Sequence, residues 1–207
     1  MPLFSIIQAA GWPIWPLLLC SVVALALIIE RFASLRTNRV VPARLLEEVL
    51  GVTQNQLPTA EMVKRLAEHS LLGRVLAAGL RAAAAEPRMP EDKLRQVFEL
   101  AGRRAVHQLE RYLTTLGTIA TAAPLLGLLG TVVGLIEIFG SQAPGGGNPA
   151  LLAHGISIAL YNTAFGLMVA IPSLMFYRYF RGRIEEYELE LEQSSDQLLS
   201  QLRRLIA

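Results

Sequence analysis

Two long apolar stretches of this sequence carry threonine hydroxyls and no carboxylate near their middles. The first reads GTIATAAPLLGLLGTVVGLIEIF over 117–139, and the second reads GISIALYNTAFGLMVAIPSLMF over 155–176. A hydroxyl inside a lipid-embedded helix bonds either its own backbone or a neighbouring helix. Thr131 and Thr163 therefore either bond the carbonyl four residues earlier or line a polar path. An ion path built from these stretches would need a charge supplied by another chain.

Small residues recur at steps of three or four along both stretches, which gives each predicted helix one smooth face. Such faces let helix backbones approach closely in lipid. The residues expected to pack the helices together are Gly127, Gly130, Gly134, Ala159, Gly166 and Ala170. Pro124 and Pro172 are candidate kinks, because each removes a helix hydrogen bond. Glu137 lies near one end of the first stretch, and we interpret it as an interfacial charge rather than as part of an ion path.

The composition is that of a membrane protein. Of the 207 residues, 53% are hydrophobic, which is more than a typical soluble domain has. Three stretches approach the roughly 20 residues that cross about 30 Å of hydrocarbon. The predicted spans are 11–29, 113–139 and 151–177, and the breaker SQAPGGGNP separates the second from the third.

The basic residues predict how the chain is oriented in the membrane. Fourteen of the 19 Lys and Arg residues lie between Arg31 and Arg111, and the other five lie between Arg178 and Arg204. Loops rich in Lys and Arg stay on the cytoplasmic side. We therefore expect the N-terminal segment 1–10 and the loop 140–150 outside, with the loop 30–112 and the tail 178–207 in the cytoplasm. The predicted fold is all-α, with the second and third spans extending into a cytoplasmic helical bundle.

Apolar periodicity predicts helices inside the large loop, over 30–50 and over 61–85. Thr59 is the expected N-cap of the second of these, and EPRMPED at 86–92 ends it. No breaker occurs between Glu91 and the second span, so one continuous helix is expected to enter the membrane there. The third span is likewise expected to continue into the tail.

Enzyme signatures are missing from the sequence. It contains no phosphate loop, nucleophile elbow, HExxH or CxxC motif. The three histidines have no metal-ligand spacing and are interpreted as surface or interface residues; they are His69, His107 and His154. We therefore expect no enzymatic activity, no cofactor and no metal. The net charge of +2 gives no reason to expect nucleic-acid binding.

The block LLGLLGTVVGLI, together with GISIALYNTAFGLMVAIPSLMFY, resembles the TolQ/ExbB/MotA proton-channel family. Three spans with a large loop between the first two resemble ExbB and TolQ more than MotA, which has a fourth span. The resemblance implies a homopentamer in the bacterial inner membrane, whose second and third helices line a pore. It also implies an ExbD/TolR-type partner with one span and a membrane aspartate, and a TonB/TolA-like energy transducer. Proton motive force would then drive work across the envelope.

By position, Thr131 and Thr163 match the pore threonines of the family's second and third helices. The third helix of ExbB and TolQ usually reads GIAEAL, whereas this chain reads GISIAL, so that Ile158 replaces the glutamate. Asn162 follows one turn later and offers a neutral donor and acceptor. We interpret Asn162 as replacing some of the lost polarity.

Two functions fit the sequence. One is a pore-forming stator subunit that couples ion flow to import, envelope maintenance or motility, with either protons or sodium ions as the driving ion. The alternative is a membrane scaffold that assembles partner proteins without conducting ions. Sensitivity to the ion gradient distinguishes the two.

Overall fold

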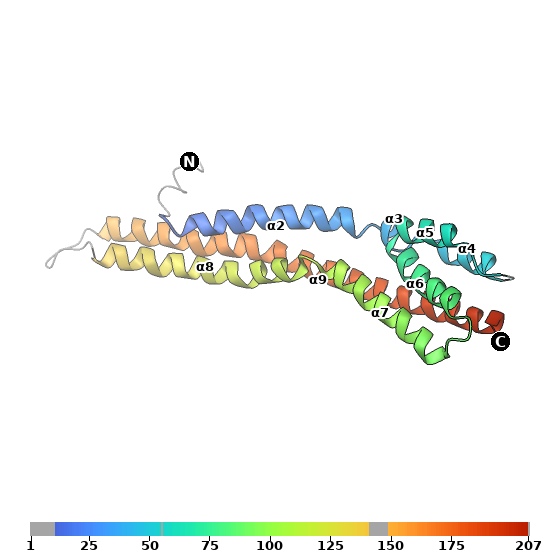
Figure 1. The fold of residues 1–207 in the computed structure, drawn as a ribbon. Coiled ribbons are helices and arrows are strands. Elements are labelled where there is room, and N and C mark those ends of the chain that lie inside the picture. The colour runs from blue at the N-terminus through green and yellow to red at the C-terminus, as the bar shows by residue number, and fades with distance from the viewer. Residues whose placement is uncertain (1–10, 55, 141–148, 207) are drawn as a thin grey trace. The chain divides into compact units, whose positions relative to one another are not determined.

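The computed structural model describes residues 11–54, 56–140 and 149–206, and every regular element within these ranges is an α-helix (Figure 1). Three helical stretches are long and apolar enough to cross a membrane: Ile14–Ser34, Glu91–Gly140 and Leu152–Leu205. The predicted all-α fold with three candidate spans is therefore confirmed. The side of the membrane on which each loop lies stays a prediction.

The described residues form two compact units. The first, here called the apolar unit, comprises residues 11–30, 112–140 and 149–179. It contains most of α2 (Ile14–Ser34), all of α8 (Leu113–Gly140) and the first part of α9 (Pro149–Ile206). The second, here called the charged unit, comprises residues 31–111 and 180–206.

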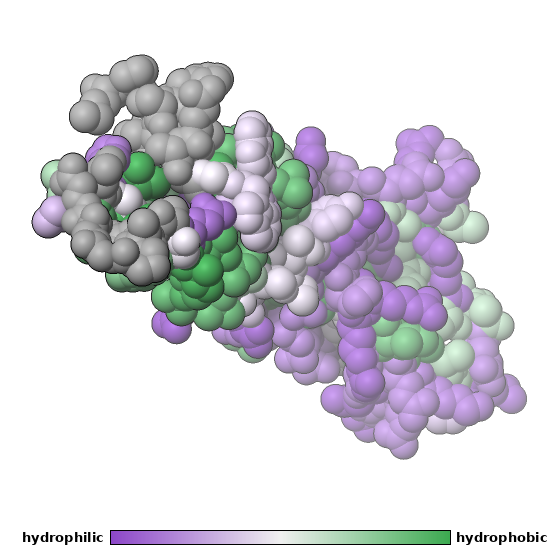
Figure 2. All heavy atoms as spheres, turned by 90° about the vertical axis from the view of Figure 1, so that its left-hand side faces the viewer, coloured by the Kyte–Doolittle hydropathy of each residue, from purple (hydrophilic) through white to green (hydrophobic). Residues whose placement is uncertain are grey.

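The apolar unit is hydrophobic on its surface as well as in its core. Figure 2 shows hydrophobic side chains on the face of this unit that is turned to the viewer, and hydrophilic ones over the charged unit. Exposing so many large apolar side chains to water would be unfavourable, whereas exposing them to lipid is not. The outward-facing residues include Trp15, Leu19, Val22, Leu25, Leu128, Val132, Ile136, Leu167, Ile171 and Met175.

The helix expected to run unbroken from Glu91 into the second span is divided, and this prediction was wrong. Helix α7 (Glu91–Glu110) ends before a two-residue turn, and α8 begins at Leu113. Tyr112 in this turn has a φ of +66°, a conformation in which an α-helix cannot continue. The buried Arg31 donates to the Leu109 carbonyl at 2.7 Å, taking an acceptor that a continuous helix would use for its own backbone.

The loop helices are also shorter than periodicity predicted. The stretch 61–85 is divided into α5 (Ala60–His69) and α6 (Leu71–Ala85), because Ser70 is extended and its Oγ accepts from the Gly73 N–H at 3.0 Å. The expected cap at Thr59 is confirmed, since its Oγ1 accepts from the Met62 N–H at 3.4 Å. Instead of one helix over 30–50, the chain continues α2 to Ser34 and then forms two short helices. These are α3 (Thr37–Val40) and α4 (Leu45–Val52).

The second half of α9 forms part of the core of the charged unit. Its buried residues include Phe180, Ile184, Leu191, Leu198 and Leu202. The buried Tyr187 donates to the Leu35 carbonyl at 2.8 Å and accepts from Arg183 at 3.0 Å. This bond from Arg183 to the Tyr187 hydroxyl raises the pKa of the guanidinium, against the opposing effect of burial, so Arg183 stays charged at any ordinary pH.

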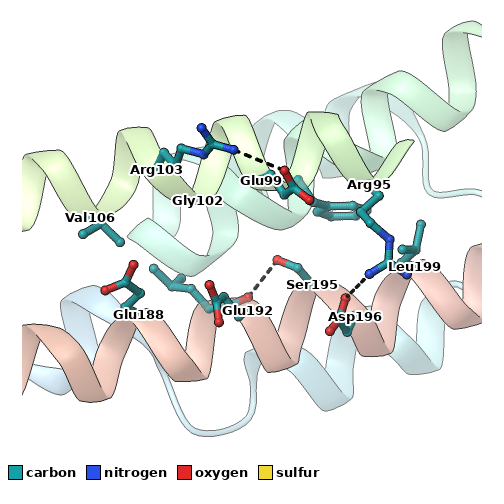
Figure 3. Close-up of a pocket in the computed structure, with 12 residues that line it drawn as sticks. Arg95, Glu99, Gly102, Arg103, Val106, Glu188, Glu192, Ser195, Asp196 and Leu199 are labelled. Carbon is teal, nitrogen blue, oxygen red and sulfur yellow. Dashed lines mark hydrogen bonds and ion pairs between the residues drawn. The ribbon is translucent and has the colours of Figure 1, made fainter. Parts of the chain in front are cut away.

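A groove of about 320 Å³ lies in the charged unit between α7 and α9 (Figure 3). Both of its walls are charged, with Arg95, Glu99 and Arg103 on α7. Arg95 reaches across to Asp196 at 3.7 Å, while Arg103 pairs with Glu99 on its own helix at 3.3 Å. These are exposed ion pairs, each worth at most about 1 kcal/mol. The Ser195 hydroxyl, which also lines the groove, donates to the backbone carbonyl four residues earlier in its own helix at 2.7 Å.

Two glycines of the charged unit test the packing of α6 on α7. A Cβ at Gly79 would lie 1.9 Å from the Phe98 ring, whereas a Cβ at Gly102 would meet no atom within 4 Å. We expect Gly79→Ala to destabilise the unit by about 1–3 kcal/mol, because the ring must move. Gly102→Ala should instead stabilise it by up to about 1 kcal/mol through helix propensity.

The stability of both variants is measured by thermal unfolding in detergent, followed by circular dichroism. Equal melting temperatures for the two variants would contradict the described packing. The double variant Gly79→Ala/Phe98→Leu should recover part of the loss, because the smaller side chain gives room for the added methyl group.

Candidate functional site

Glycines set the distance between α8 and α9 in the apolar unit. A Cβ at Gly127 would lie 2.7 Å from the Asn162 carbonyl oxygen, and a Cβ at Gly166 would lie 2.6 Å from the Ala123 carbonyl oxygen. A Cβ atom and a carbonyl oxygen do not approach so closely, so only glycine fits at either position without movement of the backbone. The close approach brings side chains near the contact within hydrogen-bonding distance of the opposite helix.

Thr131 and Thr163 meet at this contact. Their two hydroxyl oxygens are hydrogen-bonded to each other. Thr131 Oγ1 also lies 3.2 Å from the carbonyl oxygens of both Gly127 and Ala159, and Thr163 Oγ1 lies 3.3 Å from the same Gly127 oxygen. Two hydroxyl protons are thus shared among more acceptors than they can serve at once. Their hydrogen bonds can therefore be exchanged by rotating hydroxyl groups, without moving a helix.

The sequence left open whether these threonines bond their own backbone or face a neighbouring helix. Thr131 contacts the backbone of its own helix, and both residues also reach across to the opposite helix. Four other hydroxyls of these helices differ, because each donates to a carbonyl of its own helix and, among the described residues, makes no hydrogen bond to the opposite helix. These are Thr118, Thr121, Ser157 and Ser173. The sequence alone did not separate the two groups, and whether Thr131 and Thr163 line an ion path stays a prediction.

Asn162 directly precedes Thr163 and packs against Gly130 of α8. Its side chain is 1% exposed, and a Cβ at Gly130 would lie 2.8 Å from the Asn162 Cβ. The glycine thus makes room for the amide. The Asn162 Oδ1 atom accepts no hydrogen bond within the described ranges, although the residue does interact with its surroundings. The α8–α9 contact thus includes a buried amide as well as two hydroxyls.

A cavity of about 140 Å³ adjoins Asn162. Ile158 and Asn162 line it from α9, and Gly134 and Glu137 line it from α8. The amino-acid sequence did not predict that Glu137 and Asn162 line one cavity. The signal was nevertheless present, because the steps from Gly130 to Gly134 to Glu137 place all three residues on one helical face.

The remaining predicted residues lie on the same two helices. Gly134 faces Ala159, where an added Cβ would lie 3.1 Å from the alanine Cβ, and Ala170 is buried. Helices α8 and α9 continue through Pro124 and Pro172, and kinks at these residues stay predictions. Within the described ranges, no group of three or more His, Cys, Asp or Glu side chains could hold a metal ion.

Comparison with known proteins identifies similar chains. Residues 67–193 match the model of the MotA/TolQ/ExbB proton channel family. The biopolymer transport protein exbB1 of Vibrio cholerae is 32% identical, over 81% of this chain and 74% of that protein. The putative biopolymer transport protein ExbB-like 3 of Synechocystis is 34% identical, over 90% and 89%. The Tol-Pal system protein TolQ of Haemophilus influenzae is 35% identical, over 53% and 48%.

Two glycines of α9 test how tightly α8 and α9 approach. We expect Gly166→Ala to destabilise the apolar unit, by about 1–3 kcal/mol, because its methyl group would overlap the Ala123 carbonyl. Gly182→Ala on the same helix should be neutral or stabilising, because a Cβ there meets no atom within 4 Å. Thermal unfolding in the same detergent checks the pair, and unchanged stability of Gly166→Ala would contradict the described contact.

Proposed function

Because the chain belongs to the MotA/TolQ/ExbB proton channel family, we propose that it is the pore-forming stator subunit of a proton-driven motor in the bacterial inner membrane. The relatives named for biopolymer transport and for the Tol-Pal system support an energy-transducing role of the ExbB/TolQ type. The structural observation that carries the proposal is the hydroxyl pair of Thr131 and Thr163 across the α8–α9 contact.

The hydroxyl pair suits a path whose charge comes from another chain. Each hydroxyl can donate to an ionised carboxylate or accept from a protonated one. Moving an ionised carboxylate into the membrane interior has a large desolvation cost, and this cost is far smaller for a protonated carboxylate. We propose that a single-span partner of the ExbD/TolR type brings an aspartate to Thr131 and Thr163. Proton binding and release at that aspartate would then control its passage.

The surface of the apolar unit is consistent with further helix contacts. Large apolar side chains of α8 and α9 point outward, including Leu128, Val132 and Leu167. In the proposed assembly some of these side chains face lipid and others face further copies of the chain. We propose a homo-oligomer, a pentamer by family resemblance, whose pore is lined by α8 and α9. A TonB/TolA-like transducer would carry the motion across the envelope, and the charged unit would lie in the cytoplasm.

Removing both hydroxyls tests the proposal directly. The complex of this chain with its single-span partner is reconstituted in liposomes, and proton flux is followed with a pH-sensitive dye. We expect Thr131→Val/Thr163→Val to lower the flux at least tenfold, because no hydroxyl then remains to bond the partner's carboxylate. Thr118→Val and Ser157→Ala are matched controls, because each hydroxyl is exposed and bonds only its own helix. The controls should conduct within about twofold of the original chain.

The outcomes separate the stator from the scaffold. Normal flux through the double variant, at equal protein abundance, would overturn the role of the hydroxyl pair. If the unaltered complex neither conducts protons nor responds to collapse of the gradient, the non-conducting scaffold is the correct description.

A further inference from the structure

We propose that Glu137 is the titratable group of this chain's own part of the ion path, acting through the cavity that it shares with Asn162. This inference rests on the proposed function and adds to it a named proton-binding site on α8. It replaces the interpretation of Glu137 as a passive interfacial charge.

Glu137 carries the single carboxylate side chain in the three predicted spans. Between Arg111 and Arg178 it is the one acidic residue, and this interval contains no Lys or Arg. An acidic side chain in such a setting is costly unless it reaches water or a partner, and carboxylates within membrane spans usually serve a function. Glu137 is exposed in the single chain and lines the cavity.

The cavity gives the carboxylate a route towards the hydroxyl pair. Its volume of about 140 Å³ is enough for several water molecules, each of which takes about 30 Å³ in the liquid. Small and aliphatic residues make up most of its walls, among them Val133, Gly134 and Ile158. Glu137 supplies a carboxylate from α8, and Asn162 supplies an amide from α9. Water molecules in the cavity would bond the Glu137 carboxylate, and the buried Asn162 closes the cavity on the opposite helix.

The polar groups follow one another along the helix axis. Thr131 and Glu137 are six residues apart on α8, which corresponds to about 9 Å at 1.5 Å per residue. Asn162 packs against Gly130, which directly precedes Thr131, and is itself followed by Thr163, so Asn162 lies at the same level of the α8–α9 contact as the hydroxyl pair. The order is thus carboxylate, cavity, amide and hydroxyl pair. A proton that binds Glu137 from bulk water would leave it to cavity water, and the carboxylate would be restored for the next proton.

A set of variants in the liposome assay tests the site. We expect Glu137→Gln to lower proton flux at least tenfold, because an amide cannot bind and release a proton. Glu137→Asp should keep at least a third of the flux. The pH of half-maximal flux should move in Glu137→Asp, because Glu137 is the one titratable group among the described residues that line the cavity.

Two double variants test whether the carboxylate must face the cavity. Glu137→Gln/Ile158→Glu puts a carboxylate back into the cavity from α9, and it should recover flux to within about threefold of the original chain. Glu137→Gln/Ser157→Glu is the matched control, because Ser157 is exposed and is not among the residues that line the cavity. This control should stay as low as Glu137→Gln alone. Co-purification with the partner checks that all variants assemble.

Each result supports or overturns the inference. Full flux in Glu137→Gln overturns it, and so does equal recovery by the Ile158 and Ser157 variants. If Glu137→Gln does not assemble, an unmoved pH midpoint in Glu137→Asp overturns it instead. If Glu137→Gln conducts normally while Thr131→Val/Thr163→Val does not conduct, the site at Glu137 is rejected and the proposed function is retained. A complex that does not conduct in any form rejects the proposed function itself.

Discussion

The backbones of α8 and α9 approach so closely that no side chain fits between them at Gly127 and Gly166, and the candidate site depends on this approach. A hydrogen bond between two short hydroxyl side chains on different helices requires those helices to be nearly in contact. A larger residue at either glycine would separate the helices, and Thr131 and Thr163 would then bond only their own backbones. In lipid, where hydrophobicity does not drive helices together, this packing is also a main source of association.

The two units are stabilised by different forces. The charged unit buries leucines and aromatic residues such as Phe180, and exposes its ion pairs to solvent, as a water-soluble helical domain does. The apolar unit buries Leu17 and Leu116 together with small and hydroxyl residues, and it also exposes many large apolar side chains. The two units thus differ mainly at their surfaces, as expected if one is surrounded by water and the other by lipid.

The sequence predicted the helical class, the three candidate spans, the Thr59 cap and the family, because each depends on residues close together in the chain or on a distinctive motif. It failed at Ser70 and Tyr112, where helices end without a proline or a glycine. At Tyr112 the buried Arg31, far away in the sequence, bonds the Leu109 carbonyl beside the break, and no local pattern indicates such a bond. The neighbourhood of Glu137 and Asn162 was missed for a related reason. It depends on the register of α8 against α9, which the contacts of Gly127 and Gly166 determine.

The hydroxyl pair also bears on the direction of ion movement. Thr131 and Thr163 carry the same functional group, and each lies within hydrogen-bonding distance of the other and of the Gly127 carbonyl oxygen. Either hydroxyl can be the donor of the bond between them, although only Thr131 also reaches the Ala159 carbonyl oxygen. Because this bond can form in both directions, the pair alone does not act as a rectifier. In the proposed motor any one-way behaviour would come from the groups at the two ends of the path and from the gradient, so the same residues would serve flow in reverse.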